Sequence, residues 1–251
     1  MPLTASGGVL RLATTTSTHD SGLLDEIIPE FEHKHNVRVD IVAAGTGRAL
    51  KLGEAGDVDV VLVHAREEEE AFLASGHATR REDVMFNTFE ILGPPDDPAQ
   101  IRNLFAGESL QKIARQKEKF ISRGDDSGTH KREQKIWQTS GGFTLWSEYL
   151  ETGQGMASTL MMAHEKQAYV LVDRGTYLRF QRKIELVPLA ATDDSLRNPY
   201  GVLNVNPAKS SAIKAELSQK MCDFLISPIT QQRIKQFSIN GESLFFPLHL
   251  D

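Results

Sequence analysis

The sequence of 251 residues contains a single cysteine, Cys222, and no run of 18 consecutive apolar residues. One cysteine excludes an intrachain disulfide and a metal cluster held by cysteines. The absence of a long apolar run excludes a predicted transmembrane helix. Basic residues are also in the minority, since 28 Lys and Arg against 34 Asp and Glu give a formal net charge of −6. This balance argues against a nucleic acid or an anionic membrane as partner, but it is compatible with a small anion held by local donors.

Common catalytic motifs are missing as well. The sequence has no G-x-S-x-G turn for a nucleophilic serine, no H-E-x-x-H zinc motif and no nucleotide-binding glycine motif. Ser17, His19 and Asp20 are near neighbours in the chain, whereas a catalytic triad draws its members from separate elements. We therefore expect a protein that is not an enzyme and carries no cofactor and no metal cation. An enzyme on the same scaffold is the less favoured alternative.

What the chain does contain is an alternation of apolar strands and amphipathic helices. The first third predicts strands at 9–14, 37–44 and 58–65 and helices at 22–35, 47–56 and 66–76. Strands separated by helices indicate βαβ units and a parallel sheet covered on both faces. Glu67 to Glu70, in the first turn of the third helix, are expected to form a solvated acidic face.

A second region of the same kind follows a proline-rich segment. A strand at 88–92 runs into Gly93, Pro94 and Pro95, which is typical of a stiff crossing between domains. Beyond it the sequence predicts helices at 99–116, 129–140 and 153–167, strands at 119–123, 168–173 and 184–190, a return strand at 198–207, and two C-terminal helices interrupted at Pro228. The fold class is therefore α/β, with two lobes formed by residues 1–92 plus 201–251 and by residues 93–200. Two strands join the lobes, and a ligand cleft is expected between them.

Four polar loops each follow a predicted strand and precede a predicted helix, at 14–22, 44–49, 122–131 and 173–177. Each combines hydroxyl groups with glycine, which lets the backbone approach a ligand, and each helix start leaves backbone N–H groups unpaired. Such loops can hold an oxyanion, although capping of the helix is the alternative for any one of them. The loop "SRGDDSGTHK" is the most specific, because a buried Arg123 needs Asp125, Asp126 or a ligand as its partner.

Six separated blocks, "ATTTSTHDSGLLDEIIPEFE", "GTGRALKLGEAGDVDVVLVHA", "FISRGDDSGTHKRE", "GQGMASTLMMA", "AYVLVDRGTY" and "NPYGVLNVNP", resemble the tungstate-binding substrate-binding proteins of ABC transporters. The resemblance implies a type II periplasmic-binding-protein fold, with two lobes, each a mostly parallel sheet flanked by helices. It implies a bound oxyanion, tungstate or molybdate, an ABC permease as partner and a periplasmic or extracytoplasmic location. We expect the protein to be a monomer.

The same resemblance implies the ligand-binding residues. Carried over by motif, they are Thr15, Thr16, Ser17, Thr46, Arg123 and Thr129. Ser127, in the same loop as Arg123, and Arg174 and Thr176, in the loop at 173–177, are added as further candidates. Arg48 departs from the pattern, since the resemblance implies a glutamine there, and its charge adds to the expected site.

Alternatives remain open from the sequence. A phosphate- or sulfate-type anion binder is one, because Asp125 or Asp126 could accept a proton from monohydrogen phosphate. A cytosolic anion sensor no longer coupled to transport is another. The start "MPLTASGGVLRLA" lacks the basic region and long apolar segment of a secretion signal, so a cytoplasmic location is an alternative expectation.

Overall fold

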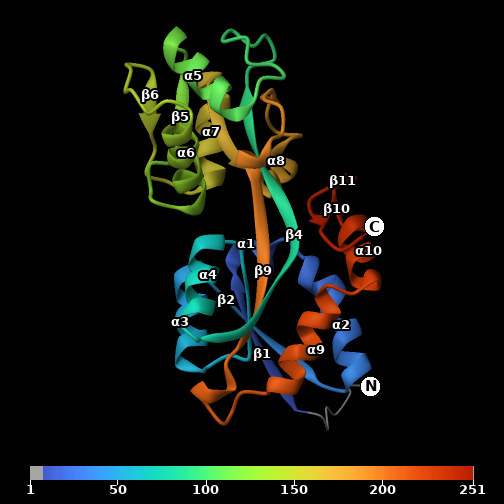
Figure 1. Ribbon diagram of the computed structural model, residues 1–251. Coiled ribbons are helices and arrows are strands. Elements are labelled where there is room, and N and C mark those ends of the chain that lie inside the picture. The colour runs from blue at the N-terminus through green and yellow to red at the C-terminus, as the bar shows by residue number, and fades with distance from the viewer. Residues whose placement is uncertain (1–7, 251) are drawn as a thin grey trace. The chain divides into compact units, whose positions relative to one another are not determined.

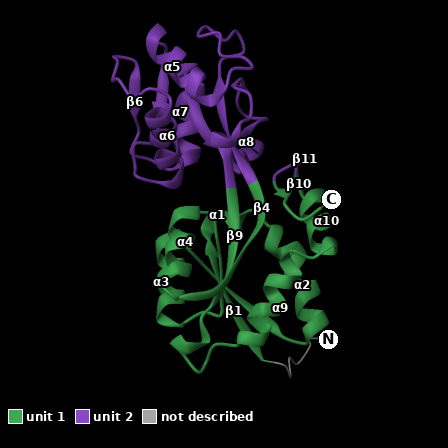
Figure 2. Ribbon diagram, viewed as in Figure 1, with its two compact units in different colours: residues 1–86, 199–238, 245–251 green, residues 87–198, 239–244 purple. Residues whose placement is uncertain are grey.

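The computed structural model describes residues 8–250, and the chain forms two compact units (Figure 2). Unit 1 comprises residues 1–86, 199–238 and 245–251, and unit 2 comprises residues 87–198 and 239–244. The chain passes between them in β4 (Ala78–Gly93) and β9 (Arg197–Val205), and again on either side of 239–244. That last segment was expected in the other lobe. Residues 1–7, on which the predicted lack of a secretion signal partly depends, lie outside the described part of the chain.

Unit 1 is built on a sheet in the order β2-β1-β3-β9-β4. Its other strands are β1 (Val9–Thr15), β2 (Arg38–Ala44), β3 (Val60–Val63) and β12 (Phe246–Pro247). β1 pairs parallel with β2 and β3, and β3 pairs antiparallel with β9. Helices α3 (Thr46–Ala55) and α4 (Arg66–Ala74) cover one face, and α2 (Leu23–His35) and α9 (Ala215–Leu225) cover the other (Figure 1). The short α1 (Thr16–Asp20) and α10 (Pro228–Gln236) complete the unit.

Unit 2 has a sheet in the order β4-β7-β5-β6. Its elements are β5 (Phe120–Ser122), β6 (Tyr149–Glu151), β7 (Tyr169–Asp173), β8 (Val187–Pro188), α5 (Ala106–Gln116), α6 (Gly128–Thr139), α7 (Met156–Lys166) and α8 (Arg174–Phe180), with the hairpin strands β10 (Ser238–Ile239) and β11 (Glu242–Ser243). β5 pairs parallel with both β6 and β7. A short 3-10 helix lies at Asp194–Leu196 in this unit, and another lies at Pro207–Lys209 in unit 1.

Alternation along β7 shows why this sheet is buried on both faces. Tyr169 and Leu171 pack in one core cluster with residues of α5 and α6, whereas Val170 and Val172 pack in another with residues of α7. Successive side chains of a strand point to opposite faces, so a run without polar residues requires helices on both sides. The α/β class and the parallel pairing predicted from the sequence are confirmed.

The predicted helix at 99–116 is wrong for its first seven residues, because α5 begins only at Ala106. The carboxylate of Asp97 accepts hydrogen bonds from the N–H groups of Ile101 and Arg102. Gln100 and Asn103 have φ angles of 54° and 64°, in the left-handed region. An aspartate that binds nearby backbone N–H groups competes with helix formation, and left-handed residues interrupt it.

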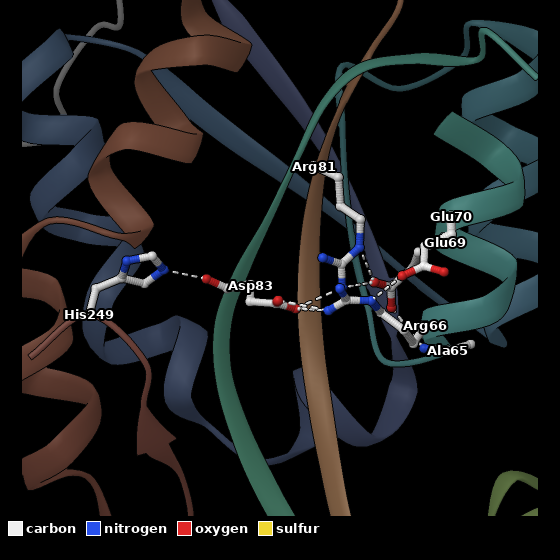
Figure 3. Close-up of polar contacts among 7 residues, drawn as sticks. All are labelled: Ala65, Arg66, Glu69, Glu70, Arg81, Asp83 and His249. Carbon is white, nitrogen blue, oxygen red and sulfur yellow. Dashed lines mark hydrogen bonds and ion pairs between the residues drawn. The ribbon is translucent and has the colours of Figure 1, made fainter. Parts of the chain in front are cut away.

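A buried ion-pair network corrects the expectation for Glu67 to Glu70 (Figure 3). Glu69 is fully buried, although its three neighbours are exposed. Its carboxylate accepts from the Ala65 N–H at 2.8 Å and from Arg81 Nε at 2.9 Å. Arg81 Nη2 also donates to Asp83 Oδ1 at 2.7 Å, and Arg66 Nη1 donates to the same oxygen. The partner arginine compensates Glu69 inside the protein, and burial still raises the pKa of this carboxyl.

The single cysteine and the two tryptophans are buried core residues. Cys222 is fully buried, and burial raises the pKa of its thiol to about 12, which makes it an inert core residue. Trp137 and Trp146 are both buried and stack edge-on with ring centroids 6.0 Å apart. Phe143 covers them from the partly exposed side. Among the described residues, no helix is long and apolar enough to cross a bilayer.

Candidate functional site

The loop that joins β5 to α6 makes a tight turn, hereafter the Arg123 loop (residues 123–129). Gly124 and Asp126 have φ angles of 59° and 57°. A Cβ on Gly124 would lie 2.6 Å from Cβ of Glu151, so glycine is required there for both conformation and space. The turn directs the chain from the end of a buried strand into the first turn of α6.

Arg123 is only partly paired in this loop. Its Nη2 donates to Asp125 Oδ2 at 2.5 Å, and its side chain is 18% exposed. The Nε atom is buried and has no hydrogen-bond partner among the described residues. Buried donors of this kind are rare because an unpaired polar group forfeits its hydration without compensation. A ligand that accepts hydrogen bonds would satisfy it.

Asp125 is fully engaged by the protein. Its Oδ1 accepts from the Ser127 N–H at 3.2 Å, and its Oδ2 accepts from Arg123. Burial alone would raise the pKa of Asp125, but hydrogen bonds from Ser127 and Arg123 outweigh burial and lower the pKa below its ordinary value. The expectation that a loop aspartate pairs with Arg123 is confirmed for Asp125. Both oxygens already bind donors.

The N-terminus of α6 adds backbone donors. Ser127 is the N-cap, and its hydroxyl accepts from the His130 N–H at 3.3 Å. Gly128 and Thr129 occupy the first two helical positions, where N–H groups have no intrahelical acceptor. The side chain of Thr129 is buried, with 7% exposure of the residue. These amides, the helix dipole and the Arg123 guanidinium together favour an anion.

Arg174 and Thr176, which start α8, are engaged elsewhere. The Arg174 guanidinium donates to Glu90 and to the Ser243 carbonyl, both at 2.8 Å, and to Glu242 at 3.2 Å. The Thr176 hydroxyl donates to Asp173 Oδ2 at 2.7 Å, and Asp173 caps the helix. These contacts tie β11 to unit 2. They occupy polar groups of both side chains within the protein.

In unit 1 the predicted site residues lie at the ends of two neighbouring strands. Thr15 on β1 is in register with Ala44 on β2, so the loops that follow start side by side. The buried Thr15 hydroxyl is hydrogen-bonded to that of Thr18 at 2.6 Å and caps α1. The polar loop expected at 14–22 is instead largely helical, because β1 ends at Thr15 and α1 begins at Thr16. Thr16 and Ser17 are exposed residues of this helix, and the Ser17 hydroxyl lies 3.2 Å from that of Thr15.

The second loop of unit 1 opens α3 without a side-chain cap. Gly45 is the N-cap, and Thr46, which is half-buried, is the first helical residue. The first-turn amides therefore lack both intrahelical and side-chain acceptors. Arg48 lies in the same turn and is exposed. Its charge stands beside uncapped amides, which again favours an anion.

Two residues of α6 were missed from the sequence. Glu133 is 2% exposed and accepts from Ser122 Oγ and Tyr149 Oη, each at 2.8 Å. His130 is 9% exposed and its Nδ1 accepts from the Asp126 N–H at 3.0 Å. Both residues precede the buried Ile136 and Trp137 by intervals that put them on the same, inner face of α6. That helical spacing was the feature of the sequence from which their burial could have been predicted. The described residues hold no cluster of three or more His, Cys, Asp or Glu that could bind a metal ion.

Comparison with known proteins assigns the family. A sequence profile of the PBP superfamily domain matches residues 4–228. The chain belongs to the PBP superfamily. This PBP-superfamily chain is 43% identical over 249 residues to the tungstate-binding protein TupA of Peptoclostridium acidaminophilum, which covers 97% of the chain and 87% of that protein.

Solved structures agree with this assignment. The tungstate-binding protein TupA of Desulfovibrio alaskensis G20 superimposes with a TM-score of 0.93 at 41% identity, covering 96% of this chain and 99% of that one. A tungstate ABC transporter structure from Geobacter sulfurreducens matches with a TM-score of 0.79 at 48% identity, covering 91% and 98%. The resemblance seen in the six sequence blocks is confirmed, and these relatives are binding and transport proteins.

Proposed function

We propose that this protein binds a tetrahedral oxyanion, tungstate or molybdate, as the solute-binding component of an ABC-type uptake system. The observation that carries the proposal is the buried, unpartnered Nε of Arg123 beside the first-turn amides of α6. The relatives named for tungstate binding support the choice of anion. On the same grounds we propose an ABC permease as partner, a periplasmic or extracytoplasmic location, a monomer and no enzymatic activity.

The proposed contact set has a part in each unit. In unit 2 it consists of the Arg123 guanidinium, the Gly128 and Thr129 amides and the hydroxyl groups of Ser127 and Thr129. In unit 1 it consists of the hydroxyl groups of Thr15, Thr16, Ser17 and Thr46, with Arg48 as an added charge. Arg174 and Thr176 are given a structural role, because their polar groups already bind Glu90, Glu242, Ser243 and Asp173. That both parts contact one ligand stays a prediction.

The chemistry of the Arg123 loop favours anions that carry no proton. Tungstate and molybdate are dianions with only acceptor oxygens, whereas monohydrogen phosphate must also donate one hydrogen bond. Both oxygens of Asp125 already accept from Arg123 and Ser127. Charge-assisted hydrogen bonds contribute about 1.5–3 kcal/mol each, so several of them offset the cost of ordering and give submicromolar affinity.

Calorimetric titration of the ligand-free protein with tungstate, molybdate, sulfate and phosphate tests the proposal. We expect tungstate and molybdate to bind with dissociation constants below about 1 μM, and phosphate to bind more weakly by two orders of magnitude or more. Phosphate binding as tight as tungstate binding would favour a phosphate-type binder. No binding of any of the four anions would contradict the proposal.

A further inference from the structure

His130 occupies a place that a glutamate or glutamine commonly fills. With Ser127 as N-cap, His130 is the third helical residue of α6. In a capping box the side chain at this third position accepts a hydrogen bond from a backbone N–H at the helix entrance, while the N-cap hydroxyl accepts from the third residue. Ser127 does accept from the His130 N–H, and the His130 ring accepts from the N–H of Asp126, one residue before the cap.

The acceptor in this case is an imidazole nitrogen. The Asp126 N–H donates to Nδ1 at 3.0 Å, so Nδ1 carries no proton. The ring proton of the neutral form is then on Nε2, which lies 3.1 Å from Nε2 of Gln134, so this proton needs the Gln134 amide turned with its oxygen toward the ring as the acceptor. A second proton would turn Nδ1 into a donor that faces the Asp126 N–H, and the hydrogen bond would be lost.

The bond holds a left-handed residue inside the Arg123 loop. Asp126 has a φ of 57°, which costs energy for any residue other than glycine and persists only where surrounding contacts enforce it. Asp125, its neighbour, fixes Arg123, and Ser127, on the other side, fixes the start of α6. A contact that fixes Asp126 therefore fixes the arginine and the amides together.

The titratable group that interacts electrostatically with the ring is Glu133 of the same helix. The loop that the ring holds carries Asp126 and the Arg123–Asp125 pair, and Glu151 of β6 lies against Gly124 of that loop. Imidazole changes its charge between about pH 5 and 8, unlike the glutamate or glutamine of an ordinary capping box. We propose that His130 is a positioning residue of the proposed oxyanion site, and that it holds the Arg123 loop in its binding conformation only while its ring is neutral.

This inference rests on the proposed function. The direction in which anion affinity changes at low pH distinguishes it from a direct electrostatic effect. A protonated ring next to the site would attract a dianion through space and tighten binding at low pH. Loss of the Asp126 contact would weaken binding at low pH. A hydrogen bond contributes about 0.5–1.5 kcal/mol, which corresponds to an affinity change of about twofold to tenfold.

The matched variant is His130→Asn, because the asparagine side-chain oxygen can accept from the Asp126 N–H at the place of Nδ1 and does not titrate. His33→Asn, at an exposed position of α2, is the control. Affinities for tungstate and molybdate are measured at pH 8.0, 6.5 and 5.8, at fixed ionic strength and micromolar anion. Any change in the anion itself affects all variants equally. Melting temperatures check that each variant is folded.

We expect the dissociation constant of the wild type, divided by that of His130→Asn, to rise about twofold to tenfold from pH 8.0 to 5.8. His33→Asn follows the wild type. A ratio that stays constant, a ratio that falls, or weak binding by a folded His130→Asn at pH 8.0 would each overturn the inference while leaving the proposed function intact. No binding by any variant, the wild type included, would contradict the proposed function itself.

A measurement on the unaltered protein keeps the inference testable if His130→Asn does not fold. Nitrogen-15 NMR of the ligand-free protein reports which ring nitrogen carries the proton. We expect an unprotonated Nδ1 at pH 8.0 and an Asp126 amide signal that shifts as the ring titrates. A proton on Nδ1 at pH 8.0, or an Asp126 amide signal that does not respond to the ring, would overturn the inference.

Discussion

Arg123 and Asp125 form a hydrogen-bonded pair at 2.5 Å that satisfies one end of the guanidinium and leaves the buried Nε without a protein partner. The aspartate thus fixes the arginine and leaves part of its hydrogen-bonding capacity for a ligand. An arginine held on one side by a carboxylate loses little further side-chain entropy when it binds an anion. The proposed function depends most on this arrangement, in which Asp125 binds one nitrogen of the guanidinium and the buried Nε is left for a ligand.

Replacing Arg123 by alanine should therefore weaken tungstate binding at least about a hundredfold. Two charge-assisted hydrogen bonds of about 1.5–3 kcal/mol each are lost. Calorimetric titration measures the change, with Arg115→Ala, an exposed arginine of α5, as the control. An unchanged affinity in Arg123→Ala would refute the assignment of the site to this loop.

Thr129→Val tests the hydroxyl at the start of α6. Valine keeps the shape of the buried side chain and removes only the polar group, so we expect an affinity loss of about tenfold with little change in melting temperature. Thr139→Val, at the exposed end of the same helix, is the matched control. Equal affinities of the two variants would show that the anion does not contact the Thr129 hydroxyl.

Much of this arrangement follows from sequence pattern. The strands and helices around residues 9–74 and 119–180 were predictable because apolar runs and amphipathic periods are strong there. The polar segments that follow strands were predictable too, but residues 16–20 form α1 where a loop was expected. β6 was missed because three residues carry no periodicity. The non-helical segment 99–105 was missed because the Asp97 carboxylate binds backbone N–H groups that a helix would use.

The hydrogen-bond and ion-pair partners of individual side chains could not be predicted from the sequence pattern. Glu69 belongs to a run of four glutamates, and only the distant Arg81 distinguishes it as the buried member. Arg174 has the same loop context as Arg123, but Glu90 and Glu242 come from distant positions in the chain and engage it. Such choices depend on tertiary neighbours, which a single sequence does not reveal.

The network in Figure 3 makes a prediction about stability. A Cβ on Gly201 of β9 would clash with Glu69 Oε2 and lie 2.9 Å from Arg81 Nη2. Gly201→Ala should displace a buried ion pair and lower the free energy of unfolding by about 3 kcal/mol. Thermal and urea unfolding measure this, with Gly155→Ala as the control because its Cβ meets nothing within 4 Å. Equal stability of both variants would mean that the network is not rigid.

Glu133 makes a prediction about pH. Burial raises the pKa of Glu133 above its ordinary value of 4.5, so at pH values above 4.5 the folded protein keeps a proton that the unfolded chain has lost. The folded state then binds more protons than the unfolded state, and this group lowers stability as pH rises through its folded pKa. Glutamine cannot ionise and retains an oxygen for Tyr149.

Relative to the wild type, Glu133→Gln should therefore gain stability as pH rises from 4.5 toward the raised folded pKa of Glu133. Melting temperatures across this range measure the difference, and Glu148→Gln, at an exposed position, should show no such trend. A stability difference that is independent of pH would mean that the pKa of Glu133 in the folded protein is not raised above its value in the unfolded chain.

The position of the bound anion tests the central claim most directly. Tungsten scatters X-rays anomalously at its absorption edge, so crystals grown with tungstate would locate the metal independently of the protein coordinates. We predict one strong peak, with tungstate oxygens at hydrogen-bond distance from Arg123 Nε and from the N–H groups of Gly128 and Thr129. A sole tungsten peak at another place, with Arg123 Nε still unpartnered, would contradict the account.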